Sequence, residues 1–250
     1  MGALSIEFKK LKRRKIWLVI AALLVVQAVW ALWATNRMNE HELLQGWEYF
    51  LYQLPVLNAI VMPVLAAVVA SRISDVEHKG QMFKVLETLM PAGKLFDTKF
   101  LCGSVYMLIT AAAQILLIIT AAGLALGFQK PVPFDKLFFY FIFTTAANLT
   151  ILLFQQILSL LFTNQAVSLA AGLAGGFIGL FTMFFPQGLD KIFIWGYYGA
   201  LMFVRMDWDR TTRITNFYYV MPDWAALIAL IFMFFVIYIV GRTLFKRREV

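Results

Sequence analysis

The sequence contains few of the residues from which active sites of soluble enzymes are built. Its 250 residues include one cysteine, Cys102, and two histidines, His41 and His78. A single cysteine excludes a disulfide within the chain and a cysteine-rich metal site. The phosphate loop GxxxxGK[ST], the zinc motif HExxH and the nucleophile motif GxSxG are all missing from the sequence. We therefore expect a chain that is not an enzyme, with no catalytic residues, metal ligands or cofactor-binding residues.

Charge is also scarce. Charged residues make up 14% and hydrophobic residues 62% of the chain, whereas a soluble domain has about 25% and about 45–50%. The net charge of +8 does not indicate a nucleic-acid partner, because the apolar excess is too large for a water-facing surface. The composition predicts an integral membrane protein in contact with lipid.

Six long apolar segments contain no Asp, Glu, Lys, Arg or His. Each can cross about 30 Å of hydrocarbon as a helix, and a charge at mid-bilayer would cost about 2.5–3.5 kcal/mol. The segments do not alternate as barrel strands do, and helices satisfy their own backbone groups. We predict an all-α integral membrane protein, with one transmembrane domain over residues 1–250. The predicted spans are 16–34, 54–71, 100–128, 137–162, 166–185 and 224–241.

The distribution of lysine and arginine predicts the orientation. With both termini cytoplasmic, 15 of the 22 basic residues lie in inner segments and seven in outer ones, as the positive-inside rule requires. Residues 3–14 combine Leu4, Phe8 and Leu11 on one helical face with basic residues elsewhere, which predicts an interfacial helix. Residues 192–204 are apolar but too few to cross the membrane, so we expect a re-entrant or interfacial segment before the last span.

The inner connection between the second and third spans, residues 74–91, has the pattern of a short amphipathic helix. Ser74 and Glu77 match a capping box. Phe83, Leu86 and Met90 share one helical face, and a proline follows them. The apolar face either rests on the membrane or the chain's own bundle, or it docks on a soluble partner.

Polar and small residues within the spans predict contacts between helices. Amide and hydroxyl side chains at one face of a span should face protein or a water-accessible cavity, either as interhelix contacts or as the lining of a translocation path. Glycines four residues apart allow close helix approach, within the bundle, at a sliding surface or at a dimer seam. The candidate path residues are Thr110, Gln114, Thr144, Asn148, Gln155 and Ser159, and the glycines are Gly123, Gly127, Gly172, Gly175, Gly176 and Gly179.

Several of these features together resemble the permease subunits of type 2 ABC exporters, and in particular the group that serves lantibiotic and bacitracin immunity. The resemblance rests on the basic entry SIEFKKLKRRK, the segment EHKGQMFKVLETLMP at 77–91, Lys99 before the third span, and the six-span layout. It also includes the aromatic sequence IWGY at 194–197. Ile194 stands where a proline is common in that group, and Met90 separates a Leu-Pro pair.

The resemblance implies that 77–91 includes a coupling helix seated on a separate cytoplasmic ABC ATPase, which would bind ATP and Mg. Two permease subunits, identical or homologous, would pair with two ATPases in the bacterial plasma membrane. The substrate implied is an amphipathic peptide or lipid-like compound, in antimicrobial-peptide immunity or export. Phe83, Leu86 and Met90 would be buried anchors, and Glu77, Lys79 and Lys84 a polar rim. The implied coupling residues are Glu77, Lys79, Gly80, Phe83, Lys84, Leu86, Met90 and Pro91.

Two other functions remain open on the sequence. A membrane anchor or regulatory scaffold would use the inner helix to recruit a cytoplasmic partner without transporting anything. A channel or uniporter would need a polar stripe that continues over several spans, whereas the stripe is pronounced only in the fourth.

Overall fold

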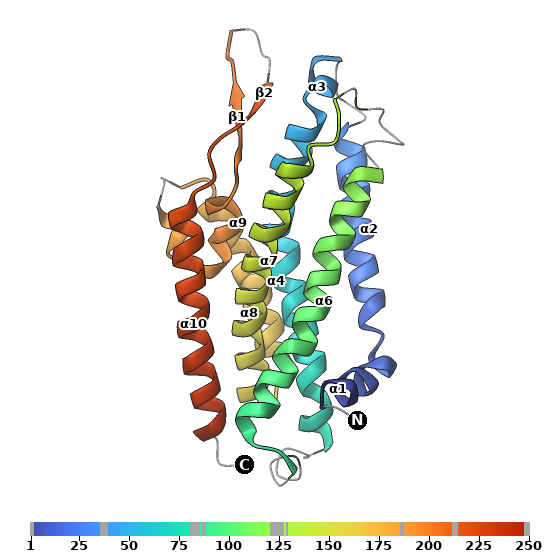
Figure 1. The fold of residues 1–250 in the computed structure, drawn as a ribbon, viewed down its shortest axis with the longest axis vertical. Helices are drawn as coiled ribbons and strands as arrows, with labels where there is room; N and C mark the ends of the chain where they lie inside the picture. Colours follow the sequence, from blue (N-terminus) through green and yellow to red (C-terminus); the bar gives the residue numbers. More distant parts are fainter. Residues whose placement is uncertain are drawn as a thin grey trace.

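The computed structural model describes residues 3–35, 40–80, 86, 89–120, 128, 130–185, 188–211 and 215–247. Six of its helices are long and apolar enough to cross a membrane, and they stand side by side in one bundle (Figure 1). The prediction of an all-α, multi-pass membrane protein is confirmed. The six helices are α2 (Ile16–Thr35), α4 (Gly46–Gly80), α6 (Ala92–Thr120), α7 (Phe134–Leu161), α8 (Gln165–Thr182) and α10 (Trp224–Arg247).

Both chain termini lie at the same end of the bundle (Figure 1). This end, which we call the terminal end, also holds α1 (Ala3–Leu11), the turn η1 (Lys12–Arg14), the last turn of α4 and the first turn of α6. The opposite end carries the short helix α3 (Glu40–Leu44) and a β-hairpin, and we call it the hairpin end.

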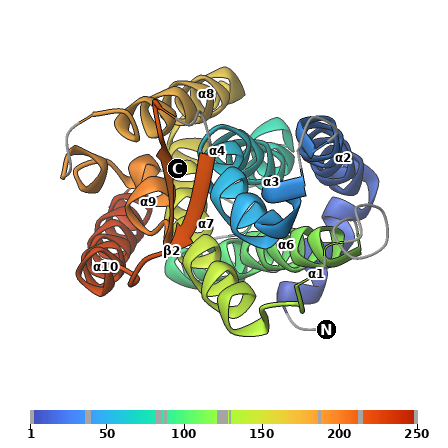
Figure 2. The same cartoon turned by 90° about the horizontal axis from the view of Figure 1, so that it is seen from above.

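Helix α4 lies at the centre of the bundle, between α7 and α8 on one side and α2 on the other (Figure 2). Its middle is fully enclosed, with Leu65 and Ala66 both at 0% exposure. It has 35 residues and runs through Ser74 and Glu77, so the predicted helix start at this capping box is wrong. The predicted span ended at the first charges, but these charges are paired within the protein and the helix continues.

Helix α6 likewise begins earlier than its predicted span. It includes Asp97 and Lys99, whose charges are matched by ion pairs, and it is described as far as Thr120. Gly123 and Gly127 lie outside the described residues.

Helix α1 forms where the sequence predicts it, but protein covers its apolar face. Leu11 is 2% exposed, and the Phe8 ring lies 5.9 Å from the ring of Tyr106 on α6. The bundle, rather than lipid, therefore receives these apolar side chains.

The segment before the last span folds as short helices followed by a hairpin. The helices are η3 (Leu189–Lys191), η4 (Ile194–Gly196) and α9 (Tyr197–Ala200), and they pack on α8 and α4. Strands β1 (Val204–Trp208) and β2 (Thr215–Tyr219) then pair antiparallel, with Val204 opposite Tyr219. The hairpin was not predicted from the sequence.

Candidate functional site: a buried charge network at the terminal end

Four charged side chains from α1, α4 and α6 meet at the terminal end. The Lys99 Nζ lies 2.8 Å from Glu77 Oε2 and 3.2 Å from Glu7 Oε2, and it also donates to the backbone oxygen of Ile73. Lys99 is 0%, Glu77 1% and Glu7 4% exposed. Burial of charge is tolerated when the charges are paired, and in this network each carboxylate forms ion pairs with both Lys99 and Lys10.

Lys10 completes the network from its outer side. Its Nζ lies 2.7 Å from Glu7 Oε1 and 2.9 Å from Glu77 Oε1. Burial alone would lower the pKa of Lys10, but hydrogen bonds to the two carboxylates raise the pKa above its usual value. The contribution of Lys10 to stability is therefore present at neutral pH, and it is lost only as the pH rises beyond about 10.5.

A second set of contacts fixes the turn between α1 and α2 to α4. Arg14 Nη1 lies 2.8 Å from Asp75 Oδ2, and Arg72 donates to the backbone oxygen of Arg14. The last two turns of α4 are thus held from one side by the N-terminal segment.

On the other side, α6 is joined to the last span. Arg242 donates to both oxygens of Asp97, at 3.1 and 3.0 Å, and the Tyr238 hydroxyl donates to Asp97 Oδ1 at 2.6 Å. Such a two-point contact between guanidinium and carboxylate fixes orientation as well as distance. The start of α6 is therefore connected by ion pairs to α1, α4 and α10.

The described part of the connection between α4 and α6 lies against this end. Leu86 and Met90 are half-buried and pack against a cluster that includes Leu95, Phe96 and Phe245. Leu86 and Met90 thus contact the chain's own bundle, which is one of the alternatives that the sequence left open, whereas Phe83, the third residue of the predicted face, lies outside the described residues. Leu89, which the sequence analysis did not select, is 74% exposed.

The other coupling candidates occupy different positions. Glu77 was expected at an exposed polar rim, but it is buried because Lys99 and Lys10 neutralise it inside the protein. Pro91 is exposed and precedes α6. The backbone of Lys79 and Gly80 belongs to the last turn of α4, whereas their side chains, and Phe83 and Lys84 entirely, lie outside the described residues.

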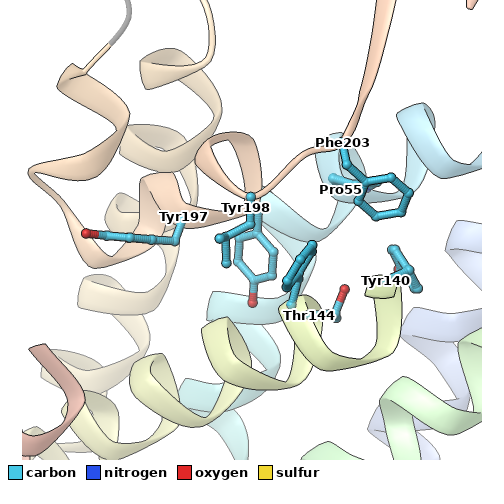
Figure 3. Close-up of a pocket in the computed structure, with 8 residues that line it drawn as sticks. Pro55, Tyr140, Thr144, Tyr197, Tyr198 and Phe203 are labelled. Atoms are coloured by element: carbon cyan, nitrogen blue, oxygen red, sulfur yellow. The ribbon is translucent and has the colours of Figure 1, made fainter. Parts of the chain in front are cut away.

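The polar stripe of α7 faces protein along its length. The Tyr198 hydroxyl donates to Asn148 at 2.6 Å. Ser159 donates to the hydroxyl of Ser168 on α8 at 2.9 Å, and Gln155 lies within 3.0 Å of the same hydroxyl. Thr144 lines a small cavity with Tyr140 and Tyr198 beneath the loop that follows α9 (Figure 3).

A second polar cluster joins four helices near the hairpin end. Gln114 on α6 donates to Gln27 on α2 at 2.6 Å and to Asn58 on α4 at 2.7 Å, and Asn58 donates to Tyr140 on α7 at 2.8 Å. Thr110, by contrast, bonds the Tyr106 backbone of its own helix. Of these four residues, the sequence had singled out only Gln114. Gln27 and Asn58 could also have been identified, because each is an amide inside an apolar span.

The glycines of α8 have two separate partners. A Cβ at Gly172 would lie 2.9 Å from the backbone oxygen of Pro63, and one at Gly176 would lie 3.0 Å from that of Ile60, both on α4. Gly175 and Gly179 instead make room for Trp195 of η4. The four glycines thus allow close contact of α8 with α4 on one side and with η4 on the other.

The chain was compared with known protein families and with curated proteins. No curated protein matches it. The sequence model of the family described as "ABC-2 family transporter protein" matches residues 3–179, a region that contains α1, the charge network, the first four spans and most of the fifth. This match covers more than half of the chain and agrees with the six-helix bundle. The chain therefore belongs to the ABC-2 transporter family of membrane proteins.

Proposed function

We propose that this chain is the permease subunit of an ABC exporter in the bacterial plasma membrane. A separate cytoplasmic ATPase, carrying ATP and Mg, drives it, and a second permease subunit, identical or homologous, completes the membrane part. The substrate is an amphipathic peptide or lipid-like compound, in antimicrobial-peptide immunity or export. Family membership supports the transport role, and the apolar composition of the bundle supports an amphipathic or lipid-like substrate.

The observation that carries the proposal is the continuity of α4. A helix of 35 residues is about 52 Å long, which is more than the thickness of the hydrocarbon core. One end leads into the segment proposed to receive the ATPase, and the other reaches the hairpin end. A displacement of the connection after Gly80 would therefore be transmitted along α4, while the charge network makes α1 and α6 follow.

The path proposed for the substrate follows the polar stripe of α7. In the described structure Asn148 and Ser159 are hydrogen-bonded to Tyr198 and Ser168. A path along this stripe needs α7 to separate from α8 and α9, after which these groups would face the substrate. Pro55 and Pro63 lie within α4, and prolines inside a helix are common positions of kinks, which gives α4 two places to bend during such a step.

The test is co-purification of this chain with the ABC ATPase subunit that its genome encodes for it, identified by its phosphate loop. We expect Phe83→Asp and Leu89→Asp each to abolish both the association with the ATPase and ATP-dependent transport, because a carboxylate cannot be buried unpaired in the contact. Leu44→Asp is the matched control, since Leu44 is also exposed, at 43%, but lies at the hairpin end. The docking assignment would be refuted by an ATPase that remains bound to both variants.

The two alternative functions give different results in the same experiment. A scaffold would hold its partner and show no ATP-dependent movement of any substrate. A channel or uniporter would move the substrate in lipid vesicles without the ATPase.

A further inference from the structure

A cavity opens at the hairpin end, far from the charge network. Its volume is about 360 Å³, within the range of small-ligand sites. It is enclosed by the first turns of α4, the end of α8 and the segment from η3 to β1. The lining residues are Tyr52, Gln53, Val56, Met183, Phe184, Asp190, Gly199, Met202, Arg205 and Met206.

The cavity lining combines apolar side chains, among them Met183, Met202 and Val56, which we call the apolar floor, with two charged side chains. Met202 is 8% exposed and lies beside the buried Gly199, and methionine side chains adapt to irregular apolar ligands. Asp190 and Arg205 place one negative and one positive charge in the lining. The lining therefore suits a ligand that has apolar groups together with charges of both signs.

Strand β1 contributes two residues to the wall of the cavity. Successive side chains of a strand point to opposite faces, yet the neighbours Arg205 and Met206 both line the cavity. Met206 is opposite Phe217 in the register, and the Phe217 ring lies 5.4 Å from the ring of the lining residue Tyr52, so the cavity meets the side of the hairpin that faces α4 and also reaches Arg205. Since β2 pairs with one edge of β1, the other edge of β1 offers backbone groups for pairing.

The outer edge of β2 differs from that of β1. The backbone N–H of Phe217 on β2 donates to Gln45 Oε1 at 2.7 Å, so the Gln45 side chain occupies that edge. Within the described residues, no side chain makes a hydrogen bond to the backbone of β1. An edge strand with free backbone groups is a template for an added strand.

We propose that the cavity and the edge of β1 together bind an extended, amphipathic peptide segment. The peptide backbone pairs with β1, its apolar side chains enter between Met183, Met202 and Val56, and its charged side chains pair with Asp190 and Arg205. A lipid could fill the apolar floor but has no backbone to pair with a strand. This inference rests on the proposed function, since it specifies a peptide as the exporter's substrate.

The test measures peptide binding to the full chain in nanodiscs of phosphatidylethanolamine and phosphatidylglycerol, without ATPase or ATP. The probe is a fluorescent ten-residue peptide in which leucine alternates with lysine or glutamate, and its N-methylated form is the comparison. We expect fluorescence anisotropy to show binding of the probe. N-methylation should weaken it at least tenfold, because it removes the backbone donors.

Met206 and Trp208 provide a matched pair of variants. Both lie on the same face of β1, at 47% and 52% exposure, but only Met206 lines the cavity. Met206→Ala should raise the Kd about three- to tenfold, from lost apolar burial, whereas Trp208→Ala should leave it unchanged. Because both side chains are exposed, both variants should fold, which thermal unfolding checks.

Two outcomes would overturn the inference. One is equal binding of the methylated and unmethylated probes, which would indicate a lipid-like site. The other is an equal Kd for wild type, Met206→Ala and Trp208→Ala. Neither outcome bears on the ATPase, so failure of this site is distinguishable from failure of the exporter, which the co-purification experiment tests.

Discussion

Lys99 is the residue on which the charge network depends. It is fully buried between Glu7 and Glu77, which belong to different helices. Removing the charge of one partner from a buried pair costs about 3–5 kcal/mol, because the remaining charge is left unpaired in a low-dielectric environment. Lys10 can compensate only in part, since it approaches the carboxylates from the partly exposed side.

We therefore expect Lys99→Met to lower the free energy of unfolding by about 3–5 kcal/mol, measured by denaturant unfolding of the purified chain in detergent. Lys12→Met is the control, because Lys12 is exposed at the same end. Adding Glu77→Gln to Lys99→Met should restore part of the loss, since one unpaired carboxylate is then removed. A Lys99→Met chain as stable as the Lys12→Met chain would show that the network does not stabilise the fold.

At the scale of the elements, the contact between α4 and α8 depends on glycine. Gly172 and Gly176 lie against backbone atoms of α4, which cannot move aside as a flexible side chain can. Close approach of backbones is a main source of helix association in a membrane, where no hydrophobic effect drives helices together. The packing of these two helices also sets the position of η4 through Gly175 and Gly179.

Gly176→Leu should therefore separate α8 from α4 and reduce stability, by the 1–3 kcal/mol typical of overpacking or more. The matched control is Ala174→Leu, on the exposed side of the same helix, which should be tolerated. Thermal unfolding in detergent compares the two. Equal melting temperatures would mean that the α4–α8 contact contributes little.

At the scale of the whole molecule, the arrangement of the ends agrees with the orientation predicted from basic residues. The elements next to the segments assigned to the cytoplasm, namely α1, the end of α4, the start of α6 and the end of α10, all lie at the terminal end (Figure 1). The hairpin, assigned to the outside, lies at the other. The structure shows that the termini and the hairpin lie at opposite ends of the bundle. Which end faces the cytoplasm remains a prediction from the distribution of basic residues.

Cysteine labelling can test the orientation, because the native Cys102 is buried. We expect Arg210→Cys, at the hairpin, to react with a membrane-impermeant maleimide in intact cells. Lys12→Cys should react only after the cells are opened. Both side chains are exposed, so the difference reports the side of the membrane. The reverse pattern would place the hairpin in the cytoplasm and overturn the orientation.

The sequence by itself determined the helical class and the six spans. Placing a charge in hydrocarbon is costly, so long segments without charged residues mark the spans. The sequence also indicated which residues within the spans need partners, such as Gln114 and Asn148. It could not predict that α4 extends past Ser74, since the charges there are tolerated only because Lys99 and Arg14 approach from other helices.

The tertiary structure alone decided the partners of these groups and the shape of the hairpin end. Leu86 and Met90 have the spacing of a docking face, but spacing does not specify what such a face contacts. In the structure both side chains pack against the chain's own bundle. The hairpin and its cavity bring together residues from 52 to 206. Such contacts depend on how the helices place distant segments side by side, which no local pattern encodes.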